Sequence, residues 1–191
     1  VERRKELTES IVDEYTKSNK KDICIIASGS SLNGAMMAES FMNKYMNCNV
    51  ICISPTDYLD YKKEFVKDRF IILVSQSGCS TNVIRAAEDL NKDGISYVAL
   101  TGNLEGDLKD YAEKLIEYGV GNETIDYVTL GLTTLNEFLI LFSLEVAYRL
   151  KKVSEQAYEE LVNQIKQCGR IGSEIFEKSV EFTKKHYEEL F

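Results

Sequence analysis

Apolar positions along the chain follow two alternating patterns. Short runs dominated by β-branched and other apolar residues recur five times. They lie at Asp22–Ala27, Val50–Ser54, Phe70–Ser75, Ser96–Thr101 and Lys114–Tyr118. Continuous apolar runs of this length are typical of strands in a parallel sheet that is covered on both faces, because neither face then meets water.

Between these runs the apolar residues return at helical spacing. We expect helices over Val1–Lys20, Leu32–Met46, Ser80–Asn91 and, as a shorter element, Leu108–Ala112. Alternation of strand and helix is the βαβ pattern, and right-handed crossovers turn it into a doubly wound sandwich. The sequence therefore predicts an α/β fold with a five-stranded parallel sheet, for which the flavodoxin-like strand order 2-1-3-4-5 is favoured.

After Gly121 the pattern becomes mostly helical. Residues Tyr127–Leu150 are apolar almost all round, which predicts a helix buried in the core or at a dimer interface. Two further helices are expected over Ser154–Gln167 and Ile171–Leu190, each with an apolar stripe that needs a surface to pack against. We therefore expect one α/β domain over residues 1–153 and additional C-terminal helices over 154–191.

Charge and histidine content exclude several classes of function. The 191 residues carry 23 basic and 31 acidic side chains, for a net charge of −8. Such a surface repels phosphate backbones, so we expect no nucleic-acid partner. With His186 as its one histidine, the chain cannot build a histidine-rich metal site, and a catalytic triad would have to use that single residue. We expect neither a metal nor a cofactor.

The cysteines and the apolar runs indicate the compartment. Five cysteines are scattered without a C-x-x-C pair, which fits a reducing cytoplasm better than a disulfide framework. The longest strongly apolar run, FLILF at 138–142, is too short to span a bilayer. We therefore expect a cytoplasmic protein with no membrane partner.

Two hydroxyl-rich loops are the strongest candidate for a binding site. The sequence SGSS at 28–31 follows the first predicted strand, and SQSGCST at 75–81 follows the third. In the order 2-1-3-4-5 these two strand ends open onto one crevice. Helix N-termini, glycines and hydroxyls can hold a phosphate there without Lys or Arg. The alternative is that Ser31 and Ser80 only cap helices; we favour the ligand because two such loops meet at the same crevice.

The same loops resemble a known family. SGSS after a strand, SQSGCS after a strand and GNETIDYVTLGLTT at 121–134 are similar to the three motifs of the sugar isomerase (SIS) domain. The similarity is strongest to the first SIS domain of glucosamine-6-phosphate synthases and fructosamine-6-phosphate deglycases, and it runs from about Asp22 to Leu150. The chain departs from the family pattern at Leu130, where Lys is common, and at Cys79, where Glu is common.

The resemblance implies a set of ligand-binding residues and a ligand. The residues it implicates in binding phosphate and sugar hydroxyls are Ser30, Ser31, Ser75, Gln76, Ser77 and Ser80. We add Gly29 and Gly78 to the expected site, because glycine lets the backbone approach an anion closely. The ligand would be a sugar phosphate of the fructose 6-phosphate or amino-sugar phosphate type. The apolar segment before Leu150 and the C-terminal helices lead us to expect a homodimer.

Catalysis needs further groups. Aldose–ketose isomerisation requires a base close to the proton that moves, and Glu123 is the local candidate because its loop should overhang the crevice. Its alternative role is to cap the following helix or to remain a solvated carboxylate. His186 could reach a partner's active site, as histidines near the C-terminus do in some single-domain members of the family, but its sequence is typical of an exposed helical face. Cys79 is either a reactive thiol or a small residue that lines the site. In two-domain members of the family the catalytic Glu and the ring-opening His come from a second SIS domain and a neighbouring subunit, and nothing in this chain resembles those segments.

Two functions remain open. In the first, the chain is the phosphosugar-binding part of an aldose–ketose isomerase, deaminase or deglycase, with residues 154–191 leading to or packing on a second SIS domain. In the second, it is a non-catalytic sugar-phosphate sensor. A sensor that regulates genes would carry a basic helix-turn-helix, whereas residues 1–21 mix both signs of charge and the C-terminal helices are acidic. This favours the enzyme.

Overall fold

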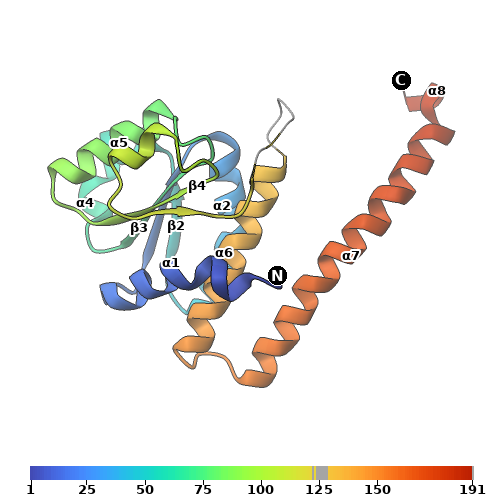
Figure 1. Cartoon of the computed structure of the whole chain (residues 1–191), viewed down its shortest axis with the longest axis horizontal. Helices are drawn as coiled ribbons and strands as arrows, with labels where there is room; N and C mark the ends of the chain where they lie inside the picture. Colours follow the sequence, from blue (N-terminus) through green and yellow to red (C-terminus); the bar gives the residue numbers. More distant parts are fainter. Residues whose placement is uncertain (122, 124–128, 191) are drawn as a thin grey trace. The chain divides into compact units, whose positions relative to one another are not determined.

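Five parallel strands form the centre of the unit over Arg3–Lys152 in the computed structural model, which describes residues 1–121, 123 and 129–190. The strands are β1 (Ile23–Ala27), β2 (Val50–Ile53), β3 (Phe70–Ser75), β4 (Tyr97–Thr101) and β5 (Leu115–Glu117). Their order in the sheet is β2-β1-β3-β4-β5, with every neighbouring pair parallel (Figure 1). Both the α/β class and the predicted strand order are confirmed.

Alternate residues of the strands enter two separate cores because successive side chains point to opposite faces of a sheet. On β1, Ile23 and Ile25 join one core, whereas Cys24 and Ile26 join the other. All five residues of β1 and all six of β3 are buried. This two-sided burial is the physical reason why the strands read as continuous apolar runs in the sequence.

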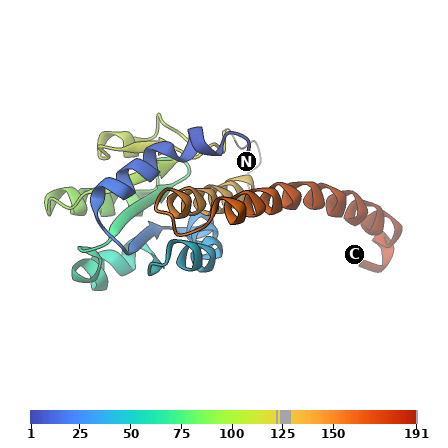
Figure 2. The same ribbon diagram turned by 90° about the horizontal axis from the view of Figure 1, so that it is seen from below.

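Three long helices cover the first face. They are α1 (Arg4–Ser18), α2 (Gly29–Met46) and α6 (Leu130–Arg149), and their buried side chains share a core with the sheet. Helices α2 and α6 lie side by side (Figures 1 and 2). They approach closely at Gly34, where a Cβ atom would lie 2.9 Å from the carbonyl oxygen of Leu132. The helix predicted over Tyr127–Leu150 is α6, which begins at Leu130 in the structure. Residues 127–128 lie outside the described part.

Helix α6 is a core helix. By length and composition alone this 20-residue helix could cross a membrane, because an 18-residue stretch of it has a mean hydropathy of 1.4. However, 56% of that stretch is buried inside the protein. The buried side chains include Leu135, Phe138, Leu139 and Phe142. Four of the five residues in the apolar run at 138–142 therefore belong to or pack against the core that joins α6 to the sheet, namely Phe138, Leu139, Ile140 and Phe142.

Shorter elements and α5 (Thr81–Lys92) cover the second face. The segment between β2 and β3 forms α3 (Pro55–Asp57), a π-helical turn η1 (Tyr58–Lys62) and α4 (Lys63–Val66), which the sequence pattern does not predict. The buried Tyr58 donates a hydrogen bond to Asp89 on α5, and Lys63 pairs with the same carboxylate. The expected helix at Leu108–Ala112 is a 3-10 turn, η2 (Asp107–Asp110).

The C-terminal residues form a unit of their own. The chain divides into a unit over Arg3–Lys152 and a second unit that holds Val153 onwards together with Val1 and Glu2. The two helices predicted over 154–190 are wrong in extent: α7 (Glu155–Lys185) is one continuous helix, followed by the short α8 (Tyr187–Leu190) (Figure 2). A glycine inside a helix costs only about 1 kcal/mol, so Gly169 does not end α7 among residues that otherwise favour helix.

Candidate functional site

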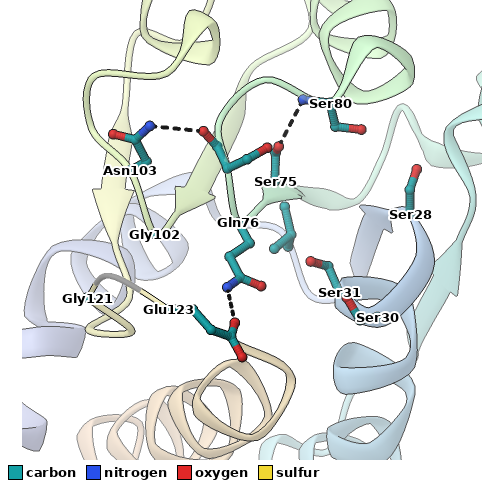
Figure 3. A pocket seen from close by; sticks show the side chains of 12 residues that line it. Ser28, Ser30, Ser31, Ser75, Gln76, Ser80, Gly102, Asn103, Gly121 and Glu123 are labelled. Carbon is teal, nitrogen blue, oxygen red and sulfur yellow. Dashed lines mark hydrogen bonds between the residues drawn. The ribbon is translucent and has the colours of Figure 1, made fainter. Parts of the chain in front are cut away.

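A cavity of about 490 Å³ lies at the carboxyl ends of β1, β3 and β4 (Figure 3). Four segments line it, each of which follows a strand. The lining residues are Ser28, Ser30, Ser31, Val74, Ser75, Gln76, Ser77, Ser80, Gly102, Asn103, Gly121 and Glu123. A parallel sheet brings the carboxyl ends of its strands to one edge, so segments up to about a hundred residues apart meet there.

Most of the residues expected at the site lie in this cavity. Six of the eight expected ligand-binding residues and the expected catalytic residue line it, namely Ser30, Ser31, Ser75, Gln76, Ser77, Ser80 and Glu123. The two expected glycines, Gly29 and Gly78, are not among the lining residues. They shape the turns instead, because their φ angles of +55° and +71° lie in the left-handed region that favours glycine.

Gly102 and Asn103 also line the cavity, although the sequence pattern does not predict them. They follow β4 directly, as the two serine-rich loops follow β1 and β3. A turn-forming Gly-Asn pair after an apolar run is a signal that could have found them. They were not predicted because the strand-order argument places the crevice at the ends of β1 and β3 and does not include the end of β4.

The serine hydroxyls do not cap the helices, so the capping alternative is wrong for Ser31 and Ser80. Ser80 occupies the N-cap of α5 without a side-chain cap hydrogen bond, and Ser31 lies inside α2, whose N-cap Ser28 also makes none. Instead, Ser75 Oγ accepts a hydrogen bond from Ser80 N at 3.3 Å. In the described part of the chain, neither helix is therefore capped by the side chain of its N-cap serine, and the first N–H groups, which carry the positive end of the helix dipole, lie at the cavity.

Glu123 is saturated with hydrogen bonds. Its Oε1 accepts from the backbone N–H groups of Thr129 at 2.7 Å and Leu130 at 2.8 Å. Its Oε2 accepts from Gln76 Nε2 at 2.6 Å and from Gly131 N at 3.3 Å. The bond from Thr129, then those from Gln76, Leu130 and Gly131, lower the pKa of Glu123 to about 2. A carboxylate with this pKa and these partners is a poor base at neutral pH, and the geometry favours its alternative role as the cap of α6.

The Gln76 side chain lies between two glycines. A Cβ atom at Gly131 would overlap its carboxamide, and one at Gly102 would lie 3.4 Å from its Cγ. The bond to Glu123 fixes Nε2 as the donor on that side (Figure 3), since a carboxylate can only accept. Gln76 Oε1 is buried without a hydrogen-bond partner among the described residues. The conformation of Gln76 thus depends on Glu123 and on the absence of a side chain at position 131.

The cavity has one charged lining residue, Glu123, among the residues that the structure describes. An anion bound there would have to be held by hydroxyls and backbone N–H groups, as at the N-terminus of a helix. In the same described part, no three His, Cys, Asp or Glu side chains come together as a metal site would need.

The two remaining candidates, Cys79 and His186, are not among the residues that line the cavity. Cys79 is exposed, and its Sγ lies 3.4 Å from the carbonyl oxygen of Ser77. His186 follows α7 and pairs with Glu189 at 3.0 Å, with its ring 4.6 Å from that of Phe182. His186 is thus engaged within the C-terminal unit.

We expect the capping bonds of Glu123 to give the protein a specific dependence on acid. Because the folded-state pKa lies below the ordinary value of 4.5, the ionised group stabilises the fold above that value, and this contribution is lost as the pH falls towards 2. In urea unfolding at a series of pH values, Glu123→Gln should be less stable than the wild type near neutrality, and the difference should shrink on acidification.

The control is Glu9→Gln, which changes an exposed carboxylate on α1 and should unfold like the wild type throughout. A constant difference between Glu123→Gln and the wild type at every pH would show that the capping bonds do not depend on ionisation.

Comparison with known proteins gives relatives of one kind. No protein-family model matches the chain. Fructoselysine 6-phosphate deglycase of Escherichia coli K12 is 29% identical over 113 residues, which are 59% of this chain and 33% of that protein. The glutamine–fructose-6-phosphate aminotransferase of Wigglesworthia glossinidia brevipalpis is 26% identical over 148 residues, 76% of this chain and 24% of that protein. The chain thus spans a third or less of these relatives.

Solved structures share the fold. A candidate phosphosugar isomerase of Clostridium difficile 630 matches with a TM-score of 0.85 and 18% identity, over 99% of this chain and 53% of that one. The C-terminal domain of the Francisella tularensis glucosamine-fructose-6-phosphate aminotransferase matches with a TM-score of 0.73 and 20% identity, over 83% of this chain and 45% of that one. An Escherichia coli CFT073 protein, solved in complex with a sugar phosphate, matches with a TM-score of 0.65 and 18% identity, over 80% of this chain and 82% of that one.

These comparisons confirm the resemblance to SIS domains, and the chain has the fold of that class. Among the similar proteins are a deglycase and an aminotransferase that are named after a 6-phosphorylated sugar derivative. Another is a candidate phosphosugar isomerase.

Proposed function

We propose that the chain is a sugar-phosphate-binding SIS domain and that the cavity at the carboxyl ends of β1, β3 and β4 holds the ligand. The observation that carries the proposal is the meeting of two uncapped helix starts, each rich in serine, in one cavity. The related proteins support it, since one of them was solved with a bound sugar phosphate and others are named for phosphosugars.

The chemistry of the two loops suggests how the ligand lies. The loop from Ser75 to Ser80 begins α5 and offers hydroxyls beside the N-terminus of a helix, which suits a phosphate. Ser30 and Ser31 at the start of α2 offer hydroxyls that can pair with those of a sugar. A ligand of the fructose 6-phosphate or amino-sugar phosphate type has both kinds of group.

The enzyme is the favoured form of this function. We propose that the domain binds the substrate of an aldose–ketose isomerase, deaminase or deglycase, because the curated relatives are enzymes by name. Since Glu123 is engaged in capping, the catalytic groups would come from a second SIS domain or a partner subunit, and residues 154–191 would lead to or pack on that domain. We also propose that the protein is cytoplasmic and forms a homodimer. The alternative is a non-catalytic sugar-phosphate sensor.

The binding proposal predicts stabilisation by phosphosugars. A ligand that binds only the native state adds RT ln(1 + [L]/Kd) to its stability, about 2.7 kcal/mol at a hundredfold excess over Kd. Fructose 6-phosphate or glucosamine 6-phosphate should therefore raise the melting temperature, free fructose should not, and Ser77→Ala should reduce the shift because it removes a lining hydroxyl.

The control variant is Ser173→Ala, which removes a hydroxyl on α7 that donates to the Gly169 carbonyl oxygen, and it should keep the full shift. If neither phosphosugar shifts the transition, or if free fructose shifts it equally, the proposed function is wrong.

A further inference from the structure

The segment after β4 supplies hydrogen-bond donors to the serine-rich loop after β3. Three successive carbonyl oxygens of that loop accept from it. The Gln76 oxygen accepts from Gly102 N at 2.9 Å, the Ser77 oxygen from Asn103 Nδ2 at 3.2 Å, and the Gly78 oxygen from Leu108 N at 2.8 Å. Three carbonyls, whose partial negative charge would repel an anion, are thus each paired with a donor of the segment over residues 102–108.

The loop is also braced by its own N–H groups. Gly78 N donates to the Ser75 carbonyl oxygen at 3.1 Å, and Cys79 N donates to Ser77 Oγ at 3.1 Å. Gly78 and Gly106 touch, since a Cβ atom at Gly106 would lie 2.6 Å from Gly78 Cα. The position of Ser77 therefore depends on both the loop and the segment after β4.

Asn103 donates through its side chain, whereas Gly102 and Leu108 donate through their backbone N–H groups. Both the nitrogen and the oxygen of the Asn103 amide make a hydrogen bond. While Nδ2 donates to the Ser77 carbonyl oxygen, Oδ1 accepts from Glu105 N at 3.1 Å. The Asn103 backbone N–H donates to Thr101 Oγ1 at 3.1 Å, which fixes the residue itself. Only one orientation of the amide satisfies both partners, so its assignment follows from the network.

We propose that Asn103 is a positioning residue of the sugar-phosphate site: it acts through Ser77, whose carbonyl it holds. Asn103 lines the cavity (Figure 3), and one Nδ2–H and one lone pair of Oδ1 are committed to Ser77 and Glu105. The proposal rests on the proposed function, because Ser77 is one of the residues assigned to the ligand.

The test is the affinity for fructose 6-phosphate, measured by calorimetry on the full chain. Asn103→Ala should weaken binding about tenfold or more, the size of effect that loss of a site-forming hydrogen bond produces. The matched control is Asn91→Ala. It also removes a bond from a side-chain amide to a backbone carbonyl, from Asn91 Nδ2 to Tyr111 at 2.9 Å, but on the far part of α5 outside the cavity. It should leave affinity within about twofold of the wild type.

A second variant separates positioning from space filling. Asn103→Asp keeps the size of the side chain and the acceptor for Glu105 N, but its carboxylate faces the Ser77 carbonyl without a proton to donate. Its affinity at neutral pH should be lower than that of Asn103→Ala. Relative to the wild type at each pH, the defect should narrow as the pH falls towards the ordinary pKa of Asp, about 3.9, because the protonated group can donate again.

The outcomes separate the two proposals. If the wild type does not bind fructose 6-phosphate or glucosamine 6-phosphate, the proposed function falls, and the role of Asn103 falls with it. If the wild type binds but Asn103→Asp binds equally well, or if Asn91→Ala weakens binding as much as Asn103→Ala, the role of Asn103 alone is overturned. Should Asn103→Ala fail to fold, the isosteric Asp variant and its pH dependence decide the question.

Discussion

Gly131→Ala is expected to leave the protein folded while it weakens sugar-phosphate binding by about tenfold or more. The added Cβ would overlap the Gln76 carboxamide, which must then leave its place between Gly131 and Gly102 and give up its bond to Glu123. That carboxamide is the end of a flexible side chain, so it can move without disturbing the backbone. Replacing Gly by Ala inside a helix also gains up to about 1 kcal/mol, which offsets part of the cost to the fold.

The measurement pairs calorimetric titration with fructose 6-phosphate and thermal unfolding of the same samples. Gly172→Ala is the matched control, since it makes the same change within α7, where a Cβ atom would meet open space. Affinity equal to that of the wild type in Gly131→Ala would mean that the conformation of Gln76 does not matter for binding.

A larger effect on stability is expected for Gly106→Ala. Here the added Cβ would lie 2.6 Å from both Gly78 Cα and the Ser77 carbonyl oxygen, which are backbone atoms that cannot simply turn aside. The φ angle of Gly106 is −68°, which any residue adopts, so the penalty is one of contact and not of backbone strain. Overpacking of this kind costs about 1–3 kcal/mol, and it should also displace Ser77 and reduce ligand binding.

Urea unfolding monitored by circular dichroism measures the first effect, and titration with fructose 6-phosphate measures the second. Gly169→Ala on α7, where a Cβ atom has no neighbour, serves as the comparison. Were Gly106→Ala as stable as the wild type, the close contact between the two loops would not exist in solution.

The strands could be predicted because their burial is two-sided. Residues such as Ile71 and Ile72 on β3 are both fully buried in different cores, so the sequence shows an unbroken apolar run, and the predicted bounds Phe70–Ser75 match β3. The segment over residues 55–66 could not be predicted in the same way. Its structure depends on Tyr58 and Lys63 reaching Asp89, about thirty residues further along, and such pairing leaves no local pattern.

The site divides along the same line. The two serine-rich loops could be predicted because the strand order alone brings the ends of β1 and β3 together. Whether Glu123 acts as a base or as a cap could not be decided from the sequence, because the answer lies in its bonds to Gln76 and to the first turn of α6. The role of Asn103 was hidden for a similar reason, since its partner Ser77 is 26 residues away.

The Glu123 carboxylate has a consequence for when the proposed site is completed during folding. It joins Gln76, at the end of a central strand, to the start of a helix that follows the last strand, across 47 residues of sequence. A contact between distant parts of a chain needs a long loop to close before it can be made. The Gln76 side chain therefore takes this place only when α6 has docked on the sheet. A nascent or truncated chain that ends before α6 would contain both serine-rich loops and still lack the arrangement that holds Gln76 in place.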